Sequence, residues 1–170
     1  VSADIPSARG SFKGSWKFLT VWQRSELPCR APPLLWSQIL AMTWVALQDN
    51  EPGVAAAYMC GFNGFLRTVE MVSITARDCT FAEDGSFVVI NLGLTKGGKR
   101  LGRAEEILTD DPVAVFLLAI VLQDKAPGTR LIPGGDIYFR QVFARHVNMI
   151  GGDPDHLKPY SIRRGGATFH

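Results

Sequence analysis

Apolar positions along the chain gather in helix-length stretches, which short breaks rich in proline, glycine and acidic residues separate. Pro33 suits the first turn of a helix, and an apolar stretch of helical length follows it. The break at residues 49–53 ends this stretch, and an alanine-rich segment comes after the break. The apolar pattern of residues 34–74 therefore predicts helices over residues 34–48, 54–62 and 69–74.

The middle of the chain changes to short runs of β-branched and aromatic residues between turn sequences. We expect strands at residues 80–81, 87–92 and 103–108. Asp110-Asp111-Pro112 then has the cap residue, first-turn acids and early proline of a helix start, which predicts a helix over residues 113–124. Asp136 is expected to cap a further helix that ends near Ile150, and Ser161 to cap the last one.

These elements predict an α+β fold that is mainly helical, with a small three-stranded antiparallel sheet packed on helices. Residues 1–33 are rich in Ser, Pro, Gly, Lys and Arg, so we interpret them as a linker or tail in front of one domain over residues 34–170. With 46% apolar residues, the chain can form a sizeable core.

Charge, cysteine usage and hydropathy narrow the function classes. The net charge is only +2, but positive charge collects in residues 1–30, 96–103 and 137–170. The three cysteines are far apart and lack metal-ligand spacing, which predicts no metal site and a reducing compartment. The longest apolar run, residues 113–122, is too short to span a bilayer, and no signal peptide is visible. We therefore expect a protein of the nucleus, nucleoid or cytoplasm, neither secreted nor membrane-bound.

Three basic residues stand in distinct settings: Arg67 after the second helix, Lys96 in a Gly-Gly hairpin turn, and Arg163 at the start of the last helix. Arginine forks onto two phosphate oxygens, and a lysine in a positive site can protonate a leaving alkoxide. If the three converge, they make a phosphate clamp able to cut a nucleic-acid backbone without metal or other cofactor.

The last helix adds a physical hint. The helix dipole disfavours Arg163 and Arg164 in a first turn, and a bound anion would reverse this effect. Gly165 and Gly166 would let a ligand or another backbone come close. The alternative is that these arginines form ordinary ion pairs, as Arg67 would with Glu70, and that the charge blocks are solvated surface.

The order of these motifs resembles the catalytic domain of tyrosine recombinases, the phage-integrase family. Phe65-Leu66-Arg67-Thr68-Val69-Glu70 is similar to its first arginine motif, and Thr95-Lys96-Gly97-Gly98-Lys99-Arg100 to the hairpin that carries its catalytic lysine. Ser161-Ile162-Arg163-Arg164-Gly165-Gly166 resembles its second arginine box, which usually reads His-x-x-Arg. The resemblance covers about residues 34–170 and implies that residues 1–33 link to an N-terminal DNA-clamping domain.

The resemblance implies a role for each matching residue. Arg67 and Arg163 would hold the scissile phosphate, Lys96 would protonate the leaving 5′ oxygen, and Glu70 would orient Arg67. Tyr160 stands where the family usually has histidine; it can donate a hydrogen bond but is a poor base at neutral pH. Basic side chains nearby are expected to contact DNA, namely Lys99, Arg100, Arg164 and His156.

The resemblance also implies a nucleophilic tyrosine a few helical turns after Arg163, and no residue of this sequence matches it. We therefore expect a C-terminally incomplete catalytic domain for DNA recombination or integration, whose partners are double-stranded DNA and, in an active full-length protein, other subunits of a synaptic complex. Two alternatives remain: an inactive DNA-binding remnant of a mobile element, or a helical protein-interaction module.

Overall fold

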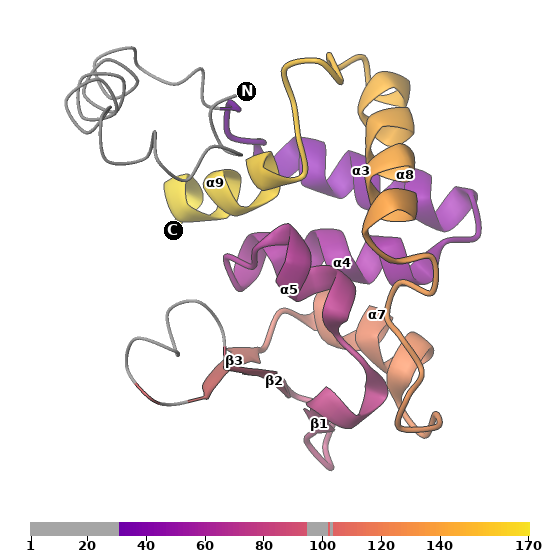
Figure 1. The fold of residues 1–170 in the computed structure, drawn as a ribbon, viewed down its shortest axis with the longest axis vertical. Coiled ribbons are helices and arrows are strands. Elements are labelled where there is room, and N and C mark those ends of the chain that lie inside the picture. Colours follow the sequence, from indigo (N-terminus) through magenta and orange to yellow (C-terminus); the bar gives the residue numbers. More distant parts are fainter. Residues whose placement is uncertain (1–30, 95–101, 103) are drawn as a thin grey trace, which may run out of the picture. The chain divides into compact units, whose positions relative to one another are not determined.

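The computed structural model describes residues 31–94, 102 and 104–170. The helices in this part of the chain are α3 (Trp36–Gln48), α4 (Pro52–Asn63), α5 (Thr68–Ser73), the 3₁₀ turn η2 (Ala76–Asp78), α7 (Pro112–Leu122), α8 (Gly135–Met149) and α9 (Tyr160–Phe169). The strands are β1 (Cys79–Phe81), β2 (Val88–Gly93) and β3 (Glu105–Thr109) (Figure 1). The predicted fold class, mainly helical with a three-stranded antiparallel sheet, is confirmed.

Local sequence explains where several helices begin. Pro52 and Pro112 occupy the first turns of α4 and α7, where a missing N–H costs nothing. The Asp111 carboxylate caps α7 by accepting a hydrogen bond from the Ala114 backbone N–H at 2.8 Å. The predicted start of α7 is therefore confirmed.

Two predicted caps are wrong. Asp136 lies inside the first turn of α8, where it pairs with Arg140 at 2.9 Å, and Gly134 holds the cap position instead. Ser161 lies inside α9, which begins one residue earlier, and its hydroxyl accepts a hydrogen bond from the Lys158 backbone N–H at 3.1 Å. In both cases the polar residue lies within the first turn of the helix, and the residue at the cap position comes before it.

The core is centred on α4. Every residue from Val54 to Phe62 is buried, because α3, α5, α7 and α9 all pack against this helix (Figure 1). Its three consecutive alanines let those neighbours approach closely. Such a helix, apolar on all sides, is stable only when surrounded. The described residues from Ala31 onward form one compact unit.

The sheet is antiparallel in the order β1-β2-β3, and β2 pairs with β3 from Val88 opposite Thr109 to Gly93 opposite Glu105. The register shifts between Asn91 and Gly93, where Gly93 takes a φ of 63°. Val88 and Ile90 point one face of β2 into the core. No helix among the described residues is long and apolar enough to cross a membrane.

Candidate functional site

The first arginine motif forms a local ion pair at the start of α5. Arg67 holds the cap position in an extended conformation, and its backbone N–H donates to Glu70 Oε2 at 2.7 Å. Its Nη1 also donates to Glu70 Oε1, at 2.5 Å. The pKa of Arg67 is raised, mainly by this hydrogen bond to Glu70. Burial opposes the rise, and the negative charges of Glu70 and Glu105 add to it. Arg67 is therefore a permanent cation with a fixed orientation.

Glu70 also reaches the second arginine motif. Arg163 on α9 places its Nη1 4.0 Å from Glu70 Oε2, so one carboxylate lies within ion-pair distance of both arginines. The Glu70 side chain is only 12% exposed, whereas Arg163 is 29% and Arg67 41% exposed. Of the three cations expected to converge, Arg67 and Arg163 therefore share one carboxylate, which is the most buried member of the cluster, while Lys96 lies outside the described residues.

Close backbone contacts of α9 with the end of α4 and with the segment before α3 set the spacing of this cluster. A Cβ atom at Gly166 would lie 1.9 Å from the Phe62 carbonyl oxygen, and one at Gly165 would lie 2.1 Å from the Leu34 carbonyl oxygen. The two glycines therefore admit the chain's own backbone. Beyond α4, Phe65 has a φ of 51°, which is costly for a bulky residue and turns the chain toward Arg67.

The other candidate residues occupy different positions. Tyr160 is the first residue of α9, on the same face as Arg163 one turn later; it is 51% exposed and contributes to the raised pKa of Arg67. Arg164 donates instead to the Ala31 carbonyl oxygen at 2.5 Å. His156 lies on the exposed loop before α9, 2.5 Å from an Asp153 carboxylate oxygen. Three candidates, Lys96, Lys99 and Arg100, lie outside the described residues.

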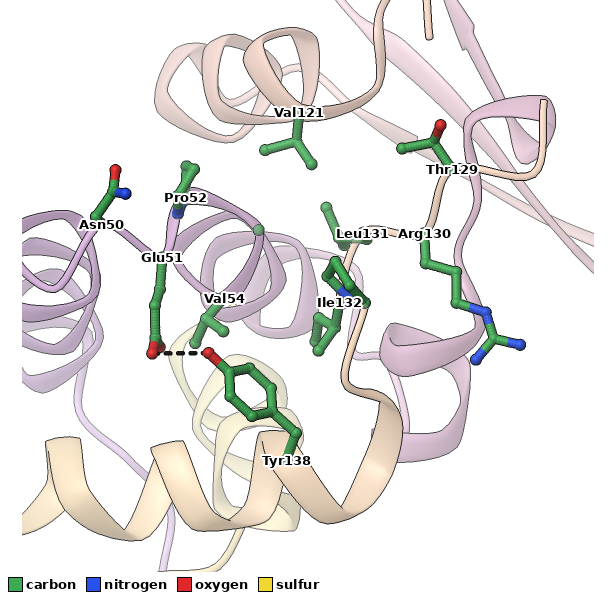
Figure 2. Close-up of a pocket in the computed structure, with 12 residues that line it drawn as sticks. Asn50, Glu51, Pro52, Val54, Val121, Thr129, Arg130, Leu131, Ile132 and Tyr138 are labelled. Atoms are coloured by element: carbon green, nitrogen blue, oxygen red, sulfur yellow. Dashed lines mark hydrogen bonds between the residues drawn. The ribbon is translucent and has the colours of Figure 1, made fainter. Parts of the chain in front are cut away.

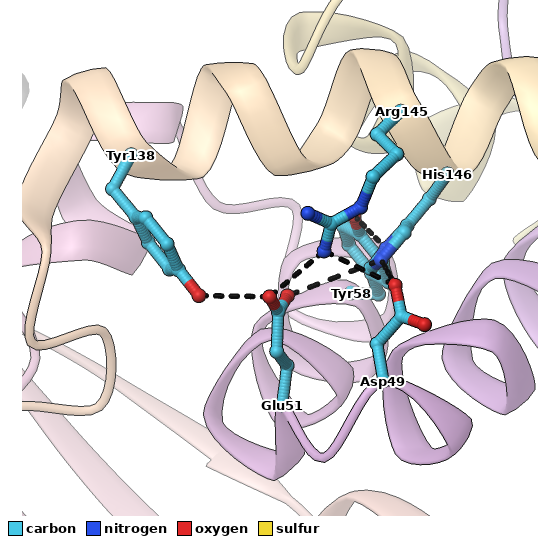
Figure 3. A network of polar contacts seen from close by, with 6 residues as sticks. All are labelled: Asp49, Glu51, Tyr58, Tyr138, Arg145 and His146. Atoms are coloured by element: carbon cyan, nitrogen blue, oxygen red, sulfur yellow. Dashed lines mark hydrogen bonds and ion pairs between the residues drawn. The ribbon is translucent and has the colours of Figure 1, made fainter.

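A second polar cluster joins the turn between α3 and α4 to α8, and sequence reasoning missed it (Figure 3). The His146 side chain of α8 is fully buried. The Tyr58 hydroxyl donates to His146 Nδ1 at 3.0 Å, and His146 Nε2–H donates to Asp49 Oδ2 at 3.1 Å. Burial is the main cause that lowers the pKa of His146 and raises the pKa of Tyr58.

The carboxylates of this cluster share one guanidinium. Arg145 Nη2 lies 2.8 Å from Glu51 Oε1 and 3.1 Å from Asp49 Oδ2, and the Tyr138 hydroxyl donates to Glu51 Oε1 at 2.8 Å. The residues of this cluster lie far apart in the sequence, so no local spacing predicts that they are in contact. The only sequence signal was a pair of acids, Asp49 and Glu51, in an apolar region otherwise free of charge.

A pocket of about 310 Å³ lies on the other side of Glu51 (Figure 2). Its walls are mostly apolar, with Val54, Val121 and Ile132 among them, and the Glu51–Tyr138 hydrogen bond crosses one side. Arg130 extends away from the other lining residues. The described residues contain no cluster of side chains that could hold a metal ion.

Comparisons with known proteins establish the fold. No family model matches the chain, and no curated protein matches it. Among solved structures, the chain is similar to the XerH site-specific recombinase, in a structure described as bound to difH substrate in a pre-cleavage complex. The TM-score is 0.59 with 13% sequence identity, and the match covers 82% of this chain and 43% of the XerH chain. The chain thus has a recombinase-like fold and spans less than half the length of that structure.

Proposed function

We propose that this chain is a recombinase-like catalytic domain, within residues 34–170, that clamps a phosphate of double-stranded DNA between Arg67 and Arg163. The observation that carries the proposal is the Glu70 carboxylate, which pairs with both arginines at 2.5 and 4.0 Å. The recombinase-like fold supports it, because the matched XerH structure is a site-specific recombinase bound to its difH substrate.

The chemistry of the cluster favours a phosphate. Both guanidiniums are partly exposed, permanently charged and able to fork onto two oxygens. They carry two positive charges against the single Glu70 carboxylate that pairs with both, while the charge of Glu105 acts on Arg67 as well. The same donors would stabilise negative charge that develops on the non-bridging oxygens when a DNA phosphate is attacked.

In this proposal Lys96 protonates the leaving 5′ oxygen, and Tyr160 donates a hydrogen bond to the phosphate. Lys99, Arg100 and His156 contact the flanking DNA backbone, and Arg164 fixes the start of α9 to Ala31. No tyrosine described here is assigned as the nucleophile. Tyr58 is buried against His146, and Tyr138 is bonded to Glu51. A nucleophile supplied with this clamp would attack the held phosphate, break the strand and allow its rejoining to another end.

DNA binding over a range of salt concentrations tests this proposal. Arg67→Ala and Arg163→Ala should each weaken binding to duplexes of unrelated sequence by about tenfold and reduce the slope of log K against log salt by about 1. Arg77→Ala is the matched control, because Arg77 is 73% exposed in η2 and pairs only with its neighbour Asp78 among the contacts described. Unchanged affinity in both clamp variants would contradict the proposal.

A helical protein-interaction module is the second candidate, because α7 exposes an uncharged apolar stripe. Val113, Phe116 and Ile120 lie on one side of this helix and are 44%, 64% and 50% exposed. Exposed apolar stripes of this kind occur at protein interfaces. DNA binding that is lost in Arg67→Ala and Arg163→Ala but retained in Phe116→Ser would favour the clamp over this alternative.

A further inference from the structure

The ends of α3, α4 and α8 share one backbone motif. Each helix is followed by a residue with positive φ, namely Asn50 (58°), Phe65 (51°) and Gly151 (77°). The backbone N–H after that residue donates to a carbonyl oxygen five residues earlier, as Leu66 does to Gly61 at 3.1 Å. Glycine and asparagine are the usual residues at this position, because a bulky side chain is strained there. An aromatic residue at the end of α4 is therefore the exception among the three.

The ring of Phe65 lies against the last turns of α9. Its centroid is 5.7 Å from that of the His170 imidazole, and the two planes meet at 75°. Gly166 leaves room for the ring, since a Cβ atom there would lie 2.9 Å from Phe65 Cδ1. Phe65 is still 37% exposed, so it is not a core residue. The ring instead joins the end of α4 to α9.

This strained residue stands two positions before the first arginine of the clamp. Arg67 follows in an extended conformation as the cap of α5, and through Glu70 it meets Arg163 of α9. Arg163 lies one helical turn before Gly166, the residue next to the Phe65 ring. The short segment after α4 therefore meets α9 at two levels, once through the ring and once through the clamp.

We propose that Phe65 is a positioning residue: its ring sets the placement of Arg67 relative to Arg163, so that both arginines can hold one phosphate. The inference rests on the proposed function and makes it more specific. Glycine or asparagine would end α4 with less backbone strain, but neither carries a ring that could contact α9. The strain at Phe65 is thus retained for the contact that aligns the clamp.

Phe65→Gly separates the two roles, because glycine suits the backbone of the helix end and removes the ring. DNA affinity is measured in the natural chain and in Phe65→Gly, each with Arg67→Ala, Arg163→Ala and both. In the natural chain the loss caused by Arg163→Ala should be about fivefold smaller once Arg67 is absent. In Phe65→Gly that loss should be the same, within about twofold, whether or not Arg67 is present.

Three further variants complete the test. Asn50→Gly makes the same backbone substitution at the end of α3 and should leave the coupling of the two arginines unchanged. Phe65→Tyr keeps the ring and should restore the natural coupling. His170→Ala removes a contact of the ring from the exposed end of α9 without altering the end of α4, so it should lower the coupling even if Phe65→Gly does not fold.

The outcomes separate this inference from the proposed function. Coupling that persists in Phe65→Gly or in His170→Ala overturns the positioning role and leaves the clamp intact. Weaker DNA binding by Phe65→Gly with intact coupling would assign the ring to direct contact with DNA, which also overturns it. A loss of coupling in Asn50→Gly would show general loosening instead of positioning. Absence of coupling in the natural chain overturns the shared clamp, and the positioning role with it.

Discussion

One carboxylate in this molecule holds two arginines, whereas one arginine elsewhere holds two carboxylates. Glu70 joins Arg67, which caps α5, to Arg163 of α9. Arg145 of α8 instead joins the two acids of the turn between α3 and α4, Asp49 and Glu51. In the first cluster two guanidiniums meet one shared carboxylate, with the charge of Glu105 acting on Arg67 as well, and in the second one guanidinium meets two carboxylates.

Burial separates the two clusters further. In the first, the shared carboxylate is the most buried group and the cations are the more exposed ones. In the second, a fully buried histidine lies at the centre, and its neutral form satisfies Tyr58 on one side and Asp49 on the other. The comparison teaches that ion pairs alone do not mark a site. The first cluster presents two partly exposed guanidiniums to solvent, and the second is suited to holding elements together.

The strongest test of this difference is His146→Ala. Loss of the imidazole leaves the buried Tyr58 hydroxyl without its acceptor and removes a partner of Asp49, so the free energy of unfolding should fall by about 3 kcal/mol. Urea unfolding measures this value. DNA affinity at a temperature where the variant remains folded should stay unchanged, and His156→Ala, at an exposed loop position, should alter stability little. A variant that keeps its stability but binds DNA more weakly would show that the His146 cluster, and not the Glu70 cluster, serves DNA binding.

Gly166→Ala should have the next largest effect, because its added methyl group would lie 1.9 Å from the Phe62 carbonyl oxygen. We expect a loss of about 2 kcal/mol in unfolding free energy together with weaker DNA binding, since α9 must shift and carry Arg163 away from Glu70. Gly128→Ala is the control, as nothing lies within 4 Å of the added atom. If Gly166→Ala loses stability but keeps its DNA affinity, the spacing of the two arginines does not determine DNA binding.

Residue spacing predicted some of this arrangement and missed the rest for identifiable reasons. The Arg67–Glu70 pair follows from a separation of three residues, and the start of α7 follows from Asp111 and Pro112. The arginine order, through the resemblance, predicted that Arg163 would approach Arg67. Partners joined only by tertiary packing, such as His146 with Tyr58, have no local pattern that could have announced them.

Backbone details were equally hidden. The positive φ of Phe65 contradicts the preference of an aromatic residue, and it occurs just beyond the end of α4, where a Cβ atom at Gly166 of α9 would lie 2.9 Å from the Phe65 ring. Asp136 and Ser161 have good capping chemistry, yet each helix begins where the chain's own turn places it.

A smaller, pH-dependent effect should distinguish the buried cluster. Because burial lowers the pKa of His146 in the folded chain, the unfolded chain binds more protons in mildly acidic solution. The contribution of His146 to stability is therefore complete above the ordinary histidine pKa of about 6.5, and it is lost progressively as pH falls through the lower pKa of the folded chain. Urea unfolding at several pH values should show this slope, and His146→Gln should flatten it. Equal slopes in both chains would show that His146 is not the responsible group.

The central claim is that Arg67 and Arg163 act on one phosphate, and a double-mutant cycle measures this directly. DNA affinity is compared for the natural chain, Arg67→Ala, Arg163→Ala and the double variant at one salt concentration. If both arginines hold the same phosphate, the second substitution should cost less once the first is present, with a coupling of about 1 kcal/mol. Losses that add within about 0.3 kcal/mol, or no loss at all, would contradict a shared clamp.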